Sequence, residues 1–214
     1  MSVTTDAIVL SLQPHSDKAH VLHAYTRAGG RVNYMVYGLG RKHPIGMYMP
    51  FSLVQITATD DPHKPPTIKE VCQRSGLSAK RSISASDPTA QAIQQQSGLY
   101  KQTVRLFIAE VLYHVLRHPM PDEPMFDFLE HAVEMLGESD EPQNFHLAFL
   151  AGFAAQLGFG IPEDDEPAHQ ALLKTPLTRA ERQAQLRAMC SYFQEHVETW
   201  QTPRSLDILM EVFD

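Results

Sequence analysis

The hydrophobic pattern of the chain changes near residue 87, and this change constrains the fold more than any other feature. Before it, short apolar runs alternate with turn-forming residues, and after it apolar residues recur three and four positions apart. The first pattern is typical of β-strands and the second of amphipathic helices. At 214 residues the chain can bury a core in each part. We therefore expect an α+β protein, with a β domain over 1–80 and an all-helical domain over 81–214.

Five short strands are expected in the β domain, at 7–12, 19–25, 31–37, 51–59 and 68–74. The third run alternates strictly, which places Val32, Tyr34 and Val36 on one face, as in a strand with one buried side. Turn formers at 13–17 and prolines at 60–66 predict loops. Because so small a sheet must protect its edges, the pattern favours a small closed barrel.

Helical periodicity predicts helices at about 98–117, 124–136 and 144–157, then one or two within 178–200 and a short one at 204–213. Gly137 is expected to end the second helix, and Asn144 to cap the third. Residues 75–88, rich in Ser, Ala and basic side chains, are expected to connect the two domains.

Charge is divided unevenly between the two parts. Residues 1–86 hold ten Lys and Arg against five Asp and Glu, a net of +5, while the remainder holds eight against twenty, a net of −12. A basic segment joined to an acidic one indicates contact with nucleic acid confined to one domain. The net charge of −7 for the whole chain hides this signal.

The segment 37–43, Tyr-Gly-Leu-Gly-Arg-Lys-His, is the most pointed local feature. Its glycines let backbone approach a ligand, Arg41 and Lys42 can neutralise phosphates, and Tyr34 and Tyr37 offer rings on which bases can stack. The third glycine of a dinucleotide fingerprint is missing and no helix is expected to follow, which excludes a Rossmann turn or a P-loop. The alternative interpretation is a hairpin tip that charge keeps in solvent.

Patterns for catalysis or metal binding are weak. His114 and His118 have the spacing of a two-histidine metal site, but no third ligand is evident and a helix C-terminus favours histidine by itself. The acidic run 163–166 is expected to be a solvated loop. Cys72 and Cys190 are too few for a disulfide framework or a four-cysteine zinc site. We expect no catalytic residue, metal or cofactor.

The termini and hydropathy carry no signal for export. The first residues lack a cationic start and an apolar run, and no stretch approaches the roughly 18 apolar residues of a membrane span. We therefore expect a cytoplasmic protein without membrane contact.

Short segments along nearly the whole chain together resemble the bacterial recombination mediator family RecO, particularly its Bacteroidetes form. The resemblance is carried by 7–10 (Ala-Ile-Val-Leu), the turn from 25–26 to Gly30, the loop 37–42, 107–113 (Phe-Ile-Ala-Glu-Val-Leu-Tyr), 126–129 (Phe-Asp-Phe-Leu), 144–147 with 157–159, and 204–209 (Arg-Ser-Leu-Asp-Ile-Leu). Each is a short pattern, and their order and spacing give the resemblance its specificity.

The resemblance implies a five-stranded OB-fold barrel followed by a helical domain, and a non-enzymatic role in DNA repair and recombination through the RecF pathway. Proteins of this family bind single- and double-stranded DNA, anneal complementary strands, and recognise the acidic C-terminal tail of single-stranded-DNA-binding protein. With RecR they help RecA to load onto coated DNA. The implied place of action is the cytoplasm, at the nucleoid.

The DNA would lie on the cationic face of the barrel. The candidate DNA-binding residues are Lys18, Arg27, Arg31, Tyr34, Tyr37, Arg41, Lys42, Lys69, Arg74, Lys80 and Arg81. Lys101 and Arg105, near the start of the first long helix, are candidates for binding a partner's carboxylate, with solvated surface charge as the alternative.

Two departures from the family pattern keep other functions open. Some members hold zinc with four cysteines in the helical domain, where this chain has only Cys190, so we expect no structural zinc. The acidic helical domain favours an alternative, a protein-interaction adaptor of the repair machinery with weak or no DNA binding. A nuclease would need a converging acidic or histidine cluster, which the sequence does not supply.

Overall fold

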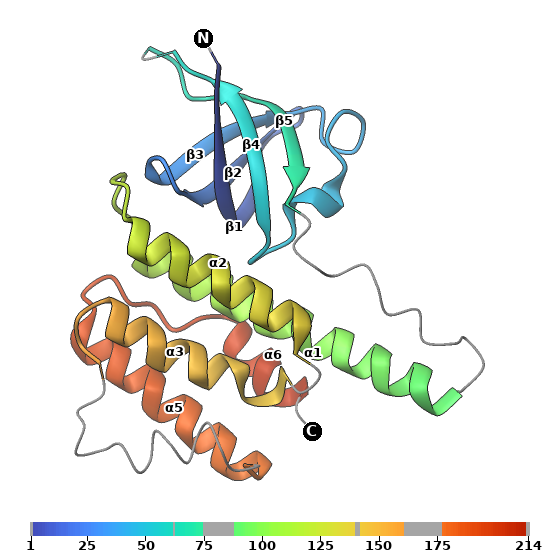
Figure 1. Cartoon of the computed structure of the whole chain (residues 1–214), viewed down its shortest axis with the longest axis vertical. Helices are drawn as coiled ribbons and strands as arrows, with labels where there is room; N and C mark the ends of the chain where they lie inside the picture. The colour runs from blue at the N-terminus through green and yellow to red at the C-terminus, as the bar shows by residue number, and fades with distance from the viewer. Residues whose placement is uncertain (1, 62, 75–87, 140–141, 161–176, 213–214) are drawn as a thin grey trace. The chain divides into compact units, whose positions relative to one another are not determined.

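Five antiparallel strands and a set of helices make up the chain in a computed structural model (Figure 1). The structure describes residues 2–61, 63–74, 88–139, 142–160 and 177–212, with backbone alone for 88–95. The α+β class and the order of strands before helices are confirmed. The predicted connector and the acidic run 163–166 lie outside the described residues.

The strands are β1 (Ser2–Ser16), β2 (Ala19–Thr26), β3 (Gly30–Tyr37), β4 (Leu53–Thr59) and β5 (Ile68–Gln73), in the sheet order β3-β2-β1-β4-β5. The predicted loop at 13–17 is wrong, because β1 continues to Ser16 past two irregularities in its register with β2. Its first half pairs with β4 and its second half with β2, so one long strand joins both sides of the sheet.

The sheet curls without closing into a continuous ladder. Near its edges, an isolated parallel bridge joins Met35 of β3 to Thr67, the residue before β5, and the Met35 amide donates to the Pro66 carbonyl at 2.8 Å. The predicted closed barrel is therefore replaced by an open five-stranded sheet. For brevity we call this curled, open sheet together with its apolar core the barrel.

The barrel encloses its own apolar core. The core residues come from all five strands and from the 3₁₀ turn η1 (Ile45–Tyr48), and they are Ala7, Val9, Leu22, Ala24, Tyr34, Val36, Tyr48, Val54, Ile56, Ala58 and Ile68. The predicted inward face of β3 is confirmed, with Tyr34 and Val36 buried and Val32 partly buried.

The helices are α1 (Pro88–Val115), α2 (Glu123–Glu138), α3 (Phe145–Gln156), α5 (Arg179–His196) and α6 (Ser205–Val212), with a 3₁₀ turn η2 (Pro142–Asn144) before α3. Gly137 lies inside α2 rather than ending it. Asn144 precedes α3 but its side chain caps no amide, since its Oδ1 accepts from Arg182 Nε at 2.9 Å. Thr178 and Glu181 form a capping box at the start of α5.

The chain forms two compact units, and each of the helices α1 and α2 contributes to both. One unit joins residues 1–76 with 112–134, and the other joins 77–111 with 135–214. In the first, the ring of Tyr25 stacks on Phe126 of α2, with centroids 6.5 Å apart. In the second, the ring of Phe193 stacks on that of Phe153, with centroids 5.9 Å apart, and lies tilted against that of Trp200, with centroids 5.1 Å apart.

Candidate nucleic-acid interface

One end of the barrel brings together several of the predicted DNA-binding residues. Ala19 lies opposite Tyr37 in the β2–β3 ladder, so Lys18 and the loop after Tyr37 lie at the same end of these strands. Lys18, Tyr37, Arg41 and Lys42 are all exposed there. We call these four residues the loop-end cluster.

The loop that carries Arg41 and Lys42 is held in one conformation by its own backbone. The amides of Arg41 and Lys42 both donate to the Gly38 carbonyl, at 3.1 and 2.9 Å, and the Gly40 amide donates to the His43 carbonyl at 2.9 Å. Gly38 has a φ of 75°, which a side chain would disfavour. These hydrogen bonds close the loop on itself and leave the side chains of Arg41 and Lys42 exposed.

The two predicted stacking rings have different environments. Tyr37 is 49% exposed, whereas Tyr34 is 5% exposed and belongs to the barrel core. Burial raises the pKa of Tyr34 to about 12. Because strict alternation puts positions 34 and 37 on opposite faces of β3, Tyr37 alone of this pair presents its ring to solvent.

Arg27 and Arg74 are engaged by carboxylates. Arg27 pairs with Glu123, Asp127 and Glu130 of α2 at 3.4, 2.7 and 2.6 Å, and its guanidinium also lies over the ring of Phe126. The hydrogen bond that Arg27 donates to Asp127 is the main cause that raises the pKa of Arg27. Arg74 pairs with Asp6 at 2.7 Å and with Glu130 at 2.9 Å.

The Arg31 side chain caps the C-terminal end of α1. Its Nη1 donates to the carbonyls of Tyr113 and Leu116, at 3.2 and 3.3 Å, and its guanidinium stacks over the Tyr113 ring. These carbonyls are the groups that a helix C-terminus leaves without helical partners. Burial lowers the pKa of Arg31. Its contacts are those of a structural side chain.

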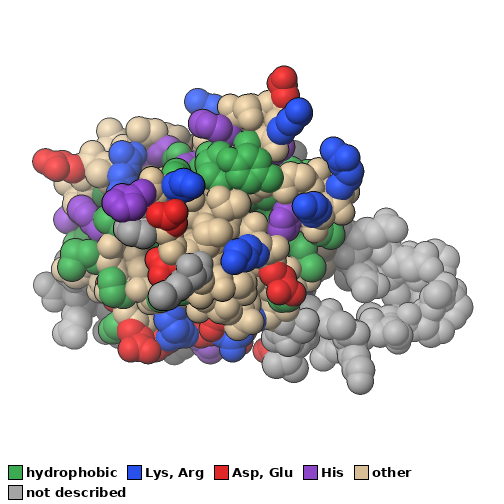
Figure 2. Space-filling view, turned by 90° about the horizontal axis from the view of Figure 1, so that it is seen from above, with side chains coloured by type: hydrophobic (Ala, Val, Ile, Leu, Met, Phe, Trp, Pro, Cys, Tyr) green, Lys and Arg blue, Asp and Glu red, His purple; other side chains and the backbone are tan. Residues whose placement is uncertain are grey.

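Three predicted DNA-binding residues of the barrel remain, and the structure describes one of them. Lys69 lies exposed on β5. Lys80 and Arg81 lie outside the described residues. Figure 2 shows one face of the molecule, on which Lys and Arg side chains are interspersed with acidic and histidine side chains rather than forming one continuous patch.

The two predicted partner-binding residues on α1 are only partly exposed. Lys101 Nζ donates to the Gly137 carbonyl at 2.8 Å. Arg105 is partly buried, and burial lowers its pKa. Neither side chain lines the hollow described next.

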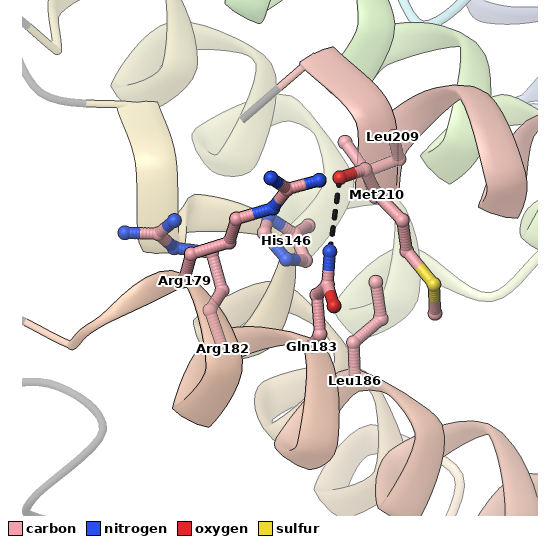
Figure 3. A pocket seen from close by; sticks show the side chains of 7 residues that line it. All are labelled: His146, Arg179, Arg182, Gln183, Leu186, Leu209 and Met210. Atoms are coloured by element: carbon pink, nitrogen blue, oxygen red, sulfur yellow. Dashed lines mark hydrogen bonds between the residues drawn. The ribbon is translucent and has the colours of Figure 1, made fainter. Parts of the chain in front are cut away.

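A small hollow in the helical unit was not predicted. It is partly open to solvent, has a cavity volume of only about 10 Å³, and is lined by His146, Arg179, Arg182, Gln183, Leu186, Leu209 and Met210 (Figure 3). Arg182 is held by Asn144 and by the Leu177 carbonyl, and Gln183 donates to the Met210 carbonyl at 3.2 Å. No pattern in the sequence predicts it, because it exists only where α6 packs beside α5.

The described residues offer no group of three or more His, Cys, Asp and Glu that could hold a metal ion. In the same part of the chain, no helix combines the length and apolar character that crossing a membrane requires.

Comparison with known proteins places the sheet and the helices in one family. The family model for the N-terminal part of recombination protein O matches residues 1–71, and that for its C-terminal part matches residues 96–171. The chain belongs to the RecO family. The resemblance is confirmed, and the open sheet followed by helices agrees with the OB-fold and helical domains of RecO proteins.

Curated relatives agree with this assignment over their full length. The chain is 28% identical to DNA repair protein RecO of Flavobacterium johnsoniae, with 100% of both chains covered. It is 26% identical to that of Phocaeicola vulgatus over 98% of each chain, and 27% identical to that of Porphyromonas gingivalis over 100% of each. Membership in this family supports a role in DNA repair and recombination.

Proposed function

We propose that this chain is a recombination mediator that binds and anneals single-stranded DNA and, with RecR, helps RecA to load onto DNA coated by single-stranded-DNA-binding protein. It would act in the cytoplasm and without catalysis. The observation that carries the proposal is the loop-end cluster, which combines exposed cations with an exposed aromatic ring at one end of a five-stranded sheet.

The chemistry of the cluster suits a single strand of any sequence. Arg41, Lys42 and Lys18 would neutralise successive phosphates, and Tyr37 would stack on one unpaired base. Among the described residues these three cations form no ion pair, so phosphate would replace water rather than a carboxylate. Cationic contacts with phosphate and ring stacking carry little sequence preference.

A titration of a fluorescent single-stranded oligonucleotide at low salt tests the proposal, beside an assay that follows annealing of complementary strands. Tyr37→Ala should weaken binding by about 1 kcal/mol or more, about fivefold, because it removes one stacking platform. Tyr37→Phe keeps the ring and should bind as the wild type does. Negligible binding by the wild type at low salt would overturn the proposal and leave the adaptor, which binds RecR without DNA.

The hollow between α5 and α6 favours a second binding function, docking of the acidic C-terminal tail of single-stranded-DNA-binding protein. Arg179 and Arg182 are cationic, and Leu186 and Leu209 line the same hollow with apolar groups. A terminal carboxylate would match the arginines, whereas Leu186 and Leu209 are almost wholly buried and the hollow has no room to enclose an apolar side chain.

Anisotropy of a labelled tail peptide is the direct test of docking. Arg179→Ala should weaken peptide binding, while Arg187→Ala, an exposed arginine of α5 outside the hollow, should not. Equal affinity of the two variants would rule out the hollow as the docking site.

A further inference from the structure

A row of carboxylates on α2 lies against the arginines of the barrel. Glu123, Asp127 and Glu130 are spaced by four and three residues, which puts them on one face of the helix. All three contact Arg27, and Glu130 bridges to Arg74. We call these three residues the α2 acidic row.

Carboxylates outnumber arginines among the ion pairs of this region. With Asp6, four carboxylates surround two guanidinium groups, Arg27 and Arg74. The local charge is therefore negative where the sequence alone predicts a cationic surface. This part of the barrel would repel a phosphate backbone as long as the α2 acidic row stays in place.

Two carboxylates of the row, those of Glu123 and Asp127, are exposed enough for another anion to take their place beside Arg27. The side chains of Glu123 and Asp127 are 75% and 60% exposed, whereas that of Glu130 is 19% exposed. Ion pairs with exposed carboxylates contribute little to stability, so another anion can replace them at low cost. The Arg27 side chain itself retains 30% exposure, which leaves a path for that anion.

Phosphate is an anion suited to this exchange. A guanidinium binds carboxylate and phosphate oxygens through the same planar array of N–H donors. We propose that Glu123 and Asp127 compete with DNA phosphate for Arg27, so that α2 limits the DNA affinity of the barrel. This inference rests on the proposed function, and it makes Arg27 a DNA ligand that is available only when these carboxylates are displaced.

The test compares two double variants with the same change in net charge. Glu123→Gln/Asp127→Asn removes the competing carboxylates and keeps Glu130, which both arginines need. Glu134→Gln/Glu138→Gln removes two exposed carboxylates of α2 that form no described ion pair. The two variants share any general effect of lower negative charge.

The measurement is the affinity of each protein for the same single-stranded oligonucleotide over a range of salt concentrations. Glu123→Gln/Asp127→Asn should bind at least about fivefold tighter than the control pair, which is the lower end of usual coupling between competing ligands. Its salt slope should be steeper by about 0.7, for one added phosphate contact. Adding Arg27→Ala should remove both gains.

Two results would overturn the inference: equal affinity of the two double variants, or a gain that survives Arg27→Ala. If the double variant fails to fold, as judged by thermal unfolding, Glu123→Gln alone is compared with Glu134→Gln by the same criteria. Binding by the wild type without any gain in the variant rejects the inference alone. Absence of binding by every one of these proteins rejects the proposed function instead.

Discussion

The imidazole of His146 is completely buried in the helical unit, edge-on to the ring of Phe107. Burial, with a smaller contribution from Arg182, lowers its pKa from 6.5 to about 3. The unfolded chain therefore binds a proton between these values and the folded chain does not. Stability is fully present above pH 6.5 and falls progressively as the pH drops toward 3.

We predict that His146→Leu loses less stability than the wild type between pH 7.5 and pH 5. The difference should be about 2 kcal/mol, because each pH unit below 6.5 costs about 1.4 kcal/mol when only the unfolded state is protonated. Urea unfolding at the two pH values measures it, with the exposed His131→Gln as control. Equal acid sensitivity of wild type and His146→Leu would contradict this account.

Individual cations show where sequence reasoning succeeds and where it stops. The sequence predicted that basic side chains would gather in the barrel, and Arg41 and Lys42 lie exposed in the loop where they were expected. It could not predict that Arg27 and Arg31 contact α2 and α1, because those partners lie more than eighty residues further along the chain. Such contacts depend on tertiary packing, which local patterns do not encode.

In the β2–β3 turn, the glycine at position 30 suits both the local backbone conformation and the packing of the turn against the chain after α1. Gly30 has a φ of 61°, and a Cβ there would lie 2.1 Å from the Met120 carbonyl oxygen. The next amide, that of Arg31, donates to the His118 carbonyl at 3.1 Å. The turn therefore needs glycine both for its backbone conformation and for close packing of the chain after α1.

We predict that Gly30→Ala destabilises the protein by about 2 kcal/mol or more, from the left-handed conformation and the forced displacement of backbone. Gly46→Ala is the matched control, since a Cβ at that position meets nothing within 4 Å and the residue has no positive φ. Thermal unfolding compares the two. A Gly30→Ala variant as stable as Gly46→Ala would show that the turn tolerates a side chain.

The strands and helices themselves were largely predictable, because strict alternation in β3 and helical periodicity in α2 are local signals. Their ends were less so. Pro14 and its turn-forming neighbours predicted a loop, yet they belong to β1, which pairs with β2 through two irregularities in register. Asn144 looked like a helix cap, and tertiary contact with Arg182 took its side chain instead.

At the scale of the whole molecule, the uneven charge of the sequence is partly cancelled within one compact unit. Residues 112–134 join the barrel, and the α2 acidic row neutralises arginines that the sequence assigned to DNA. The loop-end cluster keeps exposed cations at one end of the sheet. We therefore expect DNA to bind at the loop end of the barrel rather than over its whole basic surface.

The most direct test is the salt dependence of single-stranded DNA binding by Arg41→Ala/Lys42→Ala, compared with wild type and with Arg187→Ala/Arg204→Ala. The second pair removes the same charge from exposed positions on and before helices of the other unit. We predict a plot of log affinity against log salt that is flatter by about 1.4 for the first pair, at about 0.7 per phosphate contact, and unchanged for the second. Equal slopes for the two pairs would contradict it.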